Sequence, residues 1–157
     1  MTRLFLPADP KFVAMGTGAG ALALLLAALG LQYFAGIQPC EMCHWQRWPY
    51  IAAAILGIIG APMIKDQGNA RHLAIFLALL VLSSGLIGAY QTGMEYHLVP
   101  GPASCSGNRY VLGSGAPPPN IQCDVVAWSL FGISMASWNA ICAFVITGWA
   151  ALSLKRA

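Results

Sequence analysis

Four long stretches of this sequence contain no charged residue. They cover residues 12–40, 48–64, 73–94 and 125–154. A membrane-spanning helix needs about 20 predominantly apolar residues, with a range of about 17 to 25, so each stretch can hold one span. Only 8% of the 157 residues are charged, whereas roughly a quarter are charged in an average soluble domain. This composition argues against a water-soluble globule.

The predicted fold is an all-α membrane protein, a bundle of four transmembrane helices in a single domain over residues 1–157. A cleaved secretory signal is a weaker interpretation of the first stretch, because its apolar run exceeds the roughly 7 to 15 residues of a signal core. The expected spans cover about 12–36, 47–64, 73–94 and 133–154, and the expected outward loops cover about 37–46 and 95–132, the second being long and irregular.

Lysine and arginine residues predict the orientation, because they resist translocation and collect in cytoplasmic segments. An even number of spans places both termini on the same side. The opposite side carries only Arg47 and Arg109. Both termini are therefore expected in the cytoplasm and both loops outside it. The basic residues on the cytoplasmic side are Arg3, Lys11, Lys65, Arg71, Lys155 and Arg156.

The net charge of +3 reflects this topology and gives no indication of nucleic-acid binding, which requires a basic patch with interleaved aromatic residues. The sequence also contains no glycine-rich phosphate loop, no HExxH pair and no GxSxG motif. These common classes of soluble enzyme are therefore not indicated.

Four of the five cysteines fall on the predicted outward side: Cys40, Cys43, Cys105 and Cys123. That side is oxidising for a bacterial type of chain, so two pairs of thiols there are expected to form disulfides. Cys40 and Cys43 form a CxxC motif just before the second expected span. A thiolate is stabilised by the N–H groups at a helix N-terminus and by a nearby cation, and Arg47 lies one helical turn beyond Cys43. This pair is therefore expected to be reactive.

Cys105 and Cys123 flank a segment rich in glycine and proline, in which no long helix can form. Spacing alone leaves two interpretations of this pair equally open. A disulfide here can brace the loop, contributing roughly 3 kcal/mol by restricting the unfolded chain, or it can take part in redox chemistry. The fifth cysteine, Cys142, lies inside the fourth expected span and is interpreted as an apolar packing residue.

The segment Cys40-Glu-Met-Cys-His-Trp-Gln-Arg47 resembles the C-x-x-C-x-x-x-R motif of the disulfide bond formation protein B (DsbB) family. Residues 100–105 and 123–138 are similar to the second outward loop and the fourth span of that family. A CxxC motif alone is a weak signal. Together with the arginine, the four-span pattern and the second cysteine pair, it makes a resemblance that covers nearly the whole chain.

The resemblance implies a quinone-linked thiol oxidase of the bacterial inner membrane, with its active cysteines in the periplasm. Members of the family reoxidise a periplasmic thioredoxin-like dithiol oxidase of the DsbA type and pass two electrons to a membrane quinone, which keeps the periplasm oxidising. The family favours ubiquinone over menaquinone as the expected cofactor. A soluble dithiol and a lipid-soluble quinone cannot meet directly, so a chain of disulfide exchanges between them is physically reasonable.

The mechanism implied by the resemblance uses all four outward cysteines. The partner's thiolate attacks the Cys105–Cys123 disulfide and forms a mixed disulfide at Cys105. Cys123 then attacks the CxxC pair and joins Cys40, which leaves Cys43 as a thiolate facing the quinone. Arg47 stabilises that thiolate and the negative charge that arrives on the quinone, as a fixed cation does in a low-dielectric site.

Polar residues near the CxxC motif are further candidates. His44 follows Cys43 directly and is a candidate for tuning the pKa of Cys43 or for hydrogen-bonding the quinone. Similar members of the family often have a histidine near the outward end of the third span, where this chain has Gln91, with His97 slightly later. A quinone-binding histidine at that place is therefore an open question. Glu95 either marks the water boundary or handles protons during quinone reduction.

Two other classes of function stay open at this point. In the first, Cys40, Cys43 and His44 are soft ligands for Cu(I) or Zn in a metal-handling membrane protein. Against it, the spans contain almost no ionisable residues that could pass an ion. In the second, the protein is a structural subunit whose disulfides only brace the outer loops. That hypothesis does not explain why Arg47 lies one helical turn beyond the CxxC motif. Sequence does not separate a general partner from a dedicated one.

Overall fold

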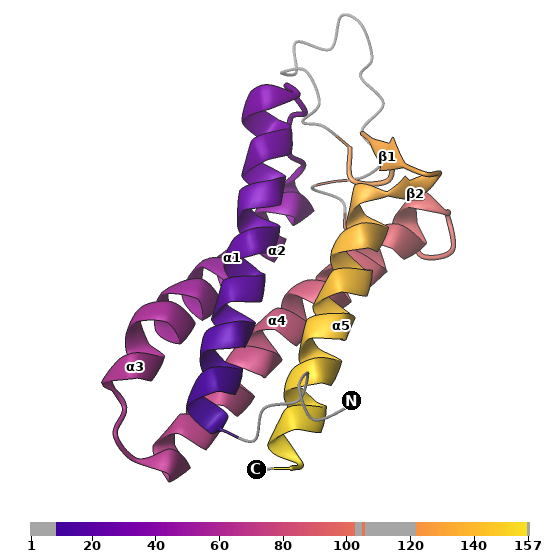
Figure 1. Cartoon of the computed structure of the whole chain (residues 1–157). Helices are drawn as coiled ribbons and strands as arrows, with labels where there is room; N and C mark the ends of the chain where they lie inside the picture. The colour runs from indigo at the N-terminus through magenta and orange to yellow at the C-terminus, as the bar shows by residue number, and fades with distance from the viewer. Residues whose placement is uncertain (1–8, 103–104, 106–121, 157) are drawn as a thin grey trace, which may run out of the picture.

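The computed structural model describes residues 9–102, 105 and 122–156. Arg3, Arg109 and most of the glycine- and proline-rich segment lie outside the described residues. Figure 1 shows a bundle of long helices with a small hairpin at one end. The elements are helices α1 (Pro10–Phe34), α2 (Glu41–Ile55), η1 (Leu56–Gly60, a π-helix), α3 (Ala61–Met63), α4 (Gln67–Glu95) and α5 (Met135–Leu154), and strands β1 (Ser129–Leu130) and β2 (Ile133–Ser134).

In the described part of the chain, three helices are long and apolar enough to cross a membrane: α1, α4 and α5. The second expected span corresponds to α2, η1 and α3, which follow one another without a break. The five residues of η1 have π-helical hydrogen bonding, which widens the helix locally. This divides the segment into shorter elements, of which α2 has 15 residues.

Each long helix, and α2, is preceded by an N-cap residue whose side chain accepts a hydrogen bond from a backbone N–H of the first turn. These N-caps are Asp9, Cys40, Asp66 and Ser134. Consequently α2 begins at Glu41 and α4 at Gln67, several residues before the expected spans. The difference arises because charged residues mark where a helix leaves the hydrocarbon, whereas caps mark where helical hydrogen bonding begins.

An antiparallel β-hairpin precedes α5, which the all-α expectation did not include. Ser129 pairs with Ser134, and Leu130 pairs with Ile133. Both residues of the turn between the strands have a positive φ, 55° at Phe131 and 78° at Gly132. That is the backbone of a type I′ turn, whose twist suits two-residue hairpins. As a result α5 begins at Met135, after residues that were expected to open the fourth span.

Glycine residues allow the helices to approach closely. A Cβ atom on Gly18 of α1 would lie 2.8 Å from the Cα of Gly57 in η1, so the two backbones are in contact. A Cβ atom on Gly85 of α4 would lie 2.7 Å from the Cβ of Ala143 in α5. Small residues at helix interfaces are typical of membrane bundles, in which packing rather than hydrophobic burial holds the helices together.

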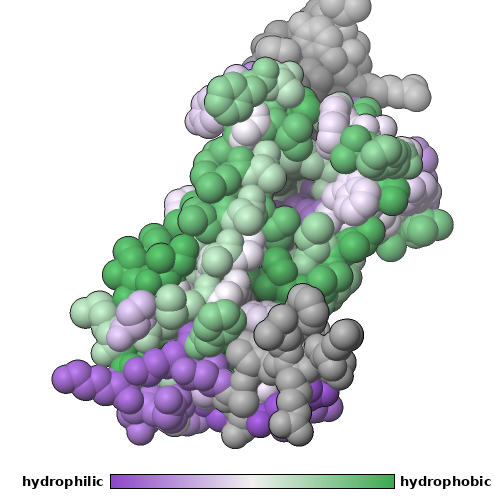
Figure 2. Space-filling model, in the orientation of Figure 1, coloured by the Kyte–Doolittle hydropathy of each residue, from purple (hydrophilic) through white to green (hydrophobic). Residues whose placement is uncertain are grey.

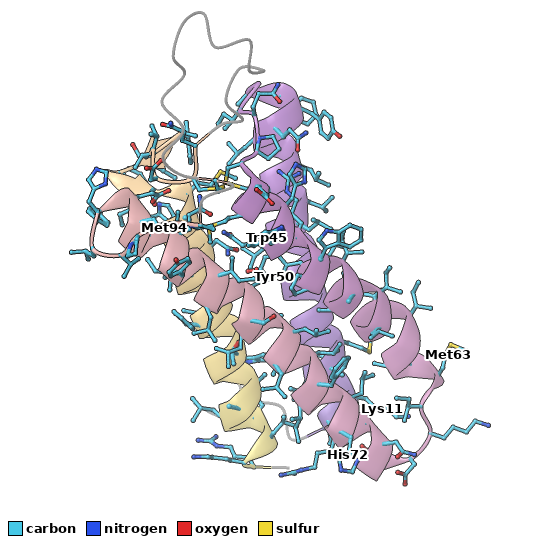
Figure 3. The ribbon with its side chains drawn as sticks, turned by 180° about the vertical axis from the view of Figure 1, so that it is seen from behind. Lys11, Trp45, Tyr50, Met63, His72 and Met94 are labelled. Atoms are coloured by element: carbon cyan, nitrogen blue, oxygen red, sulfur yellow. A yellow bond between two sulfur atoms is a disulfide. The ribbon has the colours of Figure 1, made fainter. Side chains whose placement is uncertain are left out.

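The two ends of the bundle differ in polarity. Lys65, Arg71, Lys155 and Arg156 are exposed at the end where α3 and α5 finish, and Figure 2 shows this end as a hydrophilic cap below an apolar belt. Lys11 and His72 lie at the same end, whereas Trp45 and Met94 lie in the other half of the molecule (Figure 3). We call these the basic end and the disulfide end. The exposed apolar belt between them suits a lipid environment.

Candidate functional site

The CxxC motif forms the start of α2. Cys40 is the N-cap residue, and its Sγ accepts a hydrogen bond from the backbone N–H of Cys43 at 3.2 Å. The two residues form a disulfide with a Cα–Cα distance of 5.1 Å, which lies within the usual range for disulfides. The pair thus sits where the N–H groups of the first helical turn favour negative charge.

The second pair, Cys105 and Cys123, is also joined by a disulfide, with a Cα–Cα distance of 5.4 Å. The backbone N–H of Cys123 donates to the carbonyl oxygen of Cys105 at 2.8 Å, and the N–H of Cys105 donates to the carbonyl of Pro102 at 2.9 Å. These bonds hold the two ends of the long loop side by side.

Both disulfides belong to one buried cluster at the disulfide end. Cys40, Cys105 and Cys123 are all buried, and Cys123 is completely inaccessible. They pack with Met42 of α2 and Met94 of α4, and Cys43 and Ile87 lie against the same cluster. The two cysteine pairs, which were expected on the same outward side, therefore lie at the same end of the bundle and pack against each other. Two disulfides in one cluster are well placed for exchange, because such exchange requires a thiolate to reach a sulfur atom.

One face of α2 carries the polar residues that follow the disulfide. Cys43, Gln46, Arg47 and Tyr50 have spacings of three, four and seven residues, so they share a helix face. All four line a pocket between the helices. His44 is exposed and is not among the residues lining this pocket.

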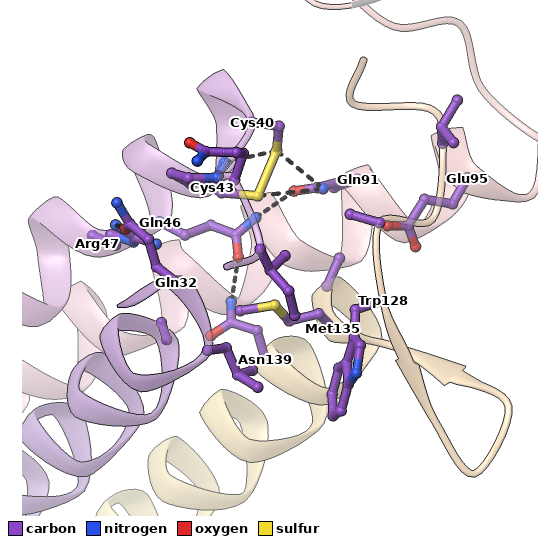
Figure 4. A pocket seen from close by; sticks show the side chains of 18 of the residues that line it. Gln32, Cys40, Cys43, Gln46, Arg47, Gln91, Glu95, Trp128, Met135 and Asn139 are labelled. Carbon is purple, nitrogen blue, oxygen red and sulfur yellow. Dashed lines mark hydrogen bonds between the residues drawn. A yellow bond between two sulfur atoms is a disulfide. The ribbon is translucent and has the colours of Figure 1, made fainter. Parts of the chain in front are cut away.

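The pocket is enclosed by the upper part of α1, the start of α2, the end of α4, the start of α5 and the segment before the hairpin (Figure 4). Its walls are largely apolar, with a few polar groups among them. The guanidinium Nη1 of Arg47 donates to Oε1 of Gln32 at 2.6 Å. The apolar lining residues include Leu24, Ala28, Leu31, Ile37, Val125, Trp128 and Met135, and the polar ones include Gln32, Gln46, Arg47, Gln91, Glu95 and Asn139.

A buried amide contacts the disulfide from α4. The Nε2 of Gln91 lies 3.4 Å from Sγ of Cys40 and 3.8 Å from Sγ of Cys43. The Oε1 of Gln91 accepts a hydrogen bond from Nε2 of Gln46 at 2.7 Å. Gln46 is in turn bonded to Asn139 of α5, whose Nδ2 donates to Oε1 of Gln46 at 2.8 Å. Figure 4 shows this line of amides running from α5 to the sulfur atoms.

The sequence profile of the family described as "Disulfide bond formation protein DsbB" matches residues 10–153. That match covers nearly the whole chain. This chain belongs to the DsbB family. It is therefore a multi-pass membrane protein and a disulfide-forming oxidoreductase, as the resemblance of the CxxC segment implied.

Curated relatives of this DsbB-family protein carry the name "Disulfide bond formation protein B". The relative from Aromatoleum aromaticum is 29% identical over 151 residues and covers 90% of each chain. That from Polaromonas naphthalenivorans is 31% identical over 150 residues, covering 86% of this chain and 84% of its own. That from Paracidovorax citrulli is 26% identical and covers 100% of this chain and 94% of its own. No solved structure gives a significant match.

Several polar residues of this DsbB-family site were not singled out from the sequence. Gln46, Tyr50 and Asn139 are bonded in the interior, and Gln91, which was noted only for standing where relatives have histidine, contacts the sulfurs. A usable signal existed, since polar residues within membrane spans are rare and commonly functional. His97 is exposed, has a φ of 56°, and does not line the pocket.

The metal-handling hypothesis gains nothing from the geometry of this DsbB-family site. Among the described residues, no three His, Cys, Asp or Glu side chains come together as a set of metal ligands. Cys40 and Cys43 are joined in a disulfide, whereas a soft metal binds the free thiolate.

Proposed function

We propose that this protein is a thiol:quinone oxidoreductase that reoxidises a periplasmic thioredoxin-like dithiol oxidase of the DsbA type and passes the electrons to a membrane quinone. The observation that carries the proposal is the packing of both disulfides in one buried cluster beside an apolar pocket that Arg47 lines. A purely structural role for the disulfides gives no reason for such a pocket next to a CxxC pair.

The proposed exchange passes one electron pair through both disulfides. A thiolate of the partner attacks Sγ of Cys105, which breaks the Cys105–Cys123 bond and releases Cys123 as a thiolate. The second partner thiol then displaces Cys105, so that the partner leaves with a new disulfide. Cys123 attacks Sγ of Cys40, which breaks the Cys40–Cys43 bond and releases the thiolate of Cys43. Cys105 then attacks Sγ of Cys123, which restores the Cys105–Cys123 disulfide and leaves Cys40 and Cys43 reduced, and the quinone accepts this electron pair as the Cys40–Cys43 disulfide forms again. The burial of Cys123 within the same cluster as Cys40 supports its attack on that residue.

The pocket fits the electron-accepting substrate. A quinone has a flat apolar ring with two polar oxygens, and the pocket offers apolar walls with a small number of polar groups, which is the usual composition of such sites. Arg47 supplies a permanent positive charge for the oxygen that becomes negative and for the thiolate of Cys43. His44 is left out of this site because it is exposed and does not line the pocket. Ubiquinone, rather than menaquinone, is the proposed acceptor.

Glu95 is the proposed proton donor. Conversion of a quinone to a quinol takes two electrons and two protons, so a proton source must lie near the ring. Among the described residues that line the pocket, Glu95 has the one carboxyl group. Its Oε2 is buried without a hydrogen-bond partner in the described structure. A carboxyl group in that position can transfer a proton to a bound oxygen.

The proposed topology has four spans, with α2, η1 and α3 together forming the second. The disulfide end then faces the periplasm, and the basic end, with both termini, faces the cytoplasm of a bacterial inner membrane. The basic residues Lys65, Arg71, Lys155 and Arg156 at one end of the bundle support this orientation, because basic residues are retained in the cytoplasm.

The function is tested with purified protein in lipid nanodiscs, a reduced thioredoxin-like dithiol partner, and ubiquinone or menaquinone. We expect one quinone to be consumed for each partner disulfide formed, with ubiquinone used faster. Cys43→Ser is expected to stop quinone reduction. Cys105→Ser is expected to stop partner oxidation while a small dithiol still drives quinone reduction through the CxxC pair. Cys142→Ser, which alters the cysteine outside both disulfides, is the matched control and should keep full activity. Normal quinone reduction by Cys43→Ser would overturn the proposal.

A further inference from the structure

We infer that a directed chain of hydrogen bonds, running from Tyr50 through Asn139 and Gln46 to Gln91, presents an N–H donor to the Cys40–Cys43 sulfurs and makes this pair a stronger oxidant. Gln91 touches the reacting sulfur atoms, whereas Gln46 and Asn139 act through it as positioning residues. This inference rests on the proposed function and deepens it, since it assigns the residues that set the redox potential of the CxxC pair.

The direction of the chain is fixed at Asn139. Its Nδ2 donates to the backbone carbonyl oxygen of Ser84 at 3.3 Å, and to Oε1 of Gln46 at 2.8 Å. A carbonyl oxygen can only accept, so the amide nitrogen of Asn139 must face Ser84. The amide oxygen then faces the opposite way, where it accepts a hydrogen bond from the Tyr50 hydroxyl at 2.6 Å. Asn139 therefore has one favourable amide orientation.

That orientation is passed on to the sulfur atoms. Because Oε1 of Gln46 accepts from Asn139, Nε2 of Gln46 points to Gln91, where it donates to Oε1 at 2.7 Å. The amide nitrogen of Gln91 is thereby directed at the disulfide, 3.4 Å from Sγ of Cys40 and 3.8 Å from Sγ of Cys43. Reversing any amide would place two donors or two acceptors against each other inside the bundle.

Burial makes this chain effective. Gln46, Gln91 and Tyr50 have exposed fractions of 7%, 5% and 3%, so little water competes for their hydrogen bonds. Hydrogen bonds in a low-dielectric interior are electrostatically stronger than in water, and bonds in a chain polarise one another. The hydrogen bonds among Tyr50, Asn139 and Gln46 therefore strengthen the hydrogen bond that Gln91 donates to the sulfurs. Ser84 adds a further tie, since its hydroxyl donates to the backbone oxygen of Gln46 at 2.9 Å.

The donor favours the reduced form of the pair. Reduction of the Cys40–Cys43 disulfide by two electrons and one proton breaks the S–S bond and yields one thiol and one thiolate. A thiolate accepts a hydrogen bond far more strongly than a disulfide sulfur, because charged acceptors form the stronger bonds. Stabilising the reduced form raises the reduction potential. The pair thus accepts electrons from Cys123 more readily, and the Nε2 of Gln91 lies 3.8 Å from Sγ of Cys43, the sulfur that is released as the thiolate.

The test measures the reduction potential of the CxxC pair without quinone and without a partner protein. The full-length protein is equilibrated in glutathione redox buffers, alkylated, and digested, and the reduced fraction of each cysteine is counted by mass spectrometry. Gln91→Met keeps the length of the side chain but removes the donor. We expect its equilibrium constant for reduction of Cys40–Cys43 to fall about tenfold, which corresponds to a potential about 30 mV lower.

Two controls accompany this variant. The Cys105–Cys123 pair in the same sample has no bond to Gln91 among the hydrogen bonds described above, so its potential should be unchanged. Thr92→Val alters the residue next to Gln91. The Thr92 hydroxyl donates to the carbonyl oxygen of Gly88 at 2.9 Å and takes no part in the hydrogen-bond chain to the sulfurs. This variant should also leave the reduction potential of the CxxC pair unchanged. Gln46→Met breaks the chain one step earlier and is measured in case Gln91→Met does not fold. It should shift the potential in the same direction.

A double-mutant cycle tests whether the chain acts through Gln91. Asn139→Leu alone should lower the CxxC potential, although Asn139 bonds neither sulfur. In the Gln91→Met background the same change should add nothing, because the donor at the end of the chain is gone. An unchanged potential in Gln91→Met, or fully additive shifts, would overturn the inference. Neither result would touch the proposed function, which fails only if Cys43→Ser still reduces quinone.

Discussion

The side chain of Arg47 in α2 is tied to Gln32 in α1 by a 2.6 Å hydrogen bond from Nη1 to Oε1. Both residues line the same pocket. A guanidinium has five N–H donors in a rigid plane, so a bond to the neighbouring helix fixes the direction in which its other donors point. The charge of Arg47 is therefore held at the pocket wall instead of extending freely to the membrane surface.

Replacing Arg47 by Leu is expected to weaken quinone reduction. Hydrogen bonds to charged groups contribute about 1.5–3 kcal/mol, so kcat/KM for quinone should fall about 10- to 100-fold. The measurement is quinone absorbance with a small dithiol as the electron donor. Gln32→Leu keeps the charge but frees the guanidinium, and should cause a smaller loss of the same kind. Unchanged kinetics in Arg47→Leu would remove this residue from the site.

Replacing His44 by Ala is expected to leave quinone kinetics within about twofold of the wild type. His44 is exposed and lies outside the pocket lining, and substitutions at such positions usually have small effects. The same quinone assay compares it with Arg47→Leu, three residues further along α2. A tenfold rise in KM for quinone in His44→Ala would show that the side chain turns toward the ring, as the sequence alone suggested.

The three long apolar helices could be predicted from the sequence, but their ends could not. Charge-free stretches indicate where the chain can lie in hydrocarbon, and α1, α4 and α5 each overlap one of them. The start of α2 depends on Cys40, which acts as its N-cap. Cysteine is not one of the usual N-cap residues, so the sequence did not indicate this helix start. The π-helical turn η1 contains Gly57, whose backbone contacts that of Gly18. Such contacts arise from tertiary packing and leave no periodic pattern in the sequence.

Cys40, Cys43 and Arg47 could be proposed as candidate site residues from the sequence because their spacing is local. Gln46, Gln91 and Asn139 come from three different helices, and their pairing depends on how α2, α4 and α5 cross. Each could have been flagged as a polar residue in or near an apolar span. Which polar group meets which is decided by close approach at small residues, such as Gly88 beside Asn139.

Replacing Gly88 by Ala is expected to destabilise the bundle. The added Cβ would lie 2.9 Å from Nδ2 of Asn139 and 3.0 Å from the backbone oxygen of Ala136, and a backbone atom cannot move aside cheaply. Overpacking of this kind costs about 1–3 kcal/mol. Gly148→Ala in α5 is the matched control, since nothing lies within 4 Å of its added Cβ, and it should stabilise by about 0.5–1 kcal/mol. Unfolding in mixed micelles measures both, and equal stabilities would refute the packing argument.

Replacing Glu95 by Gln is expected to slow quinone reduction while leaving disulfide exchange with the partner intact. The amide keeps the size of the side chain but cannot release a proton at the pocket, and loss of a general acid typically costs 10²–10⁴-fold in rate. We therefore expect kcat for quinone to fall about a hundredfold with little change in KM, measured with a small dithiol as donor. Asp124→Asn is the matched control. Asp124 also has a buried carboxyl oxygen without a hydrogen-bond partner in the described structure, but it does not line the pocket. If both variants lost activity equally, the effect would reflect buried charge near the disulfides and not proton delivery to the quinone.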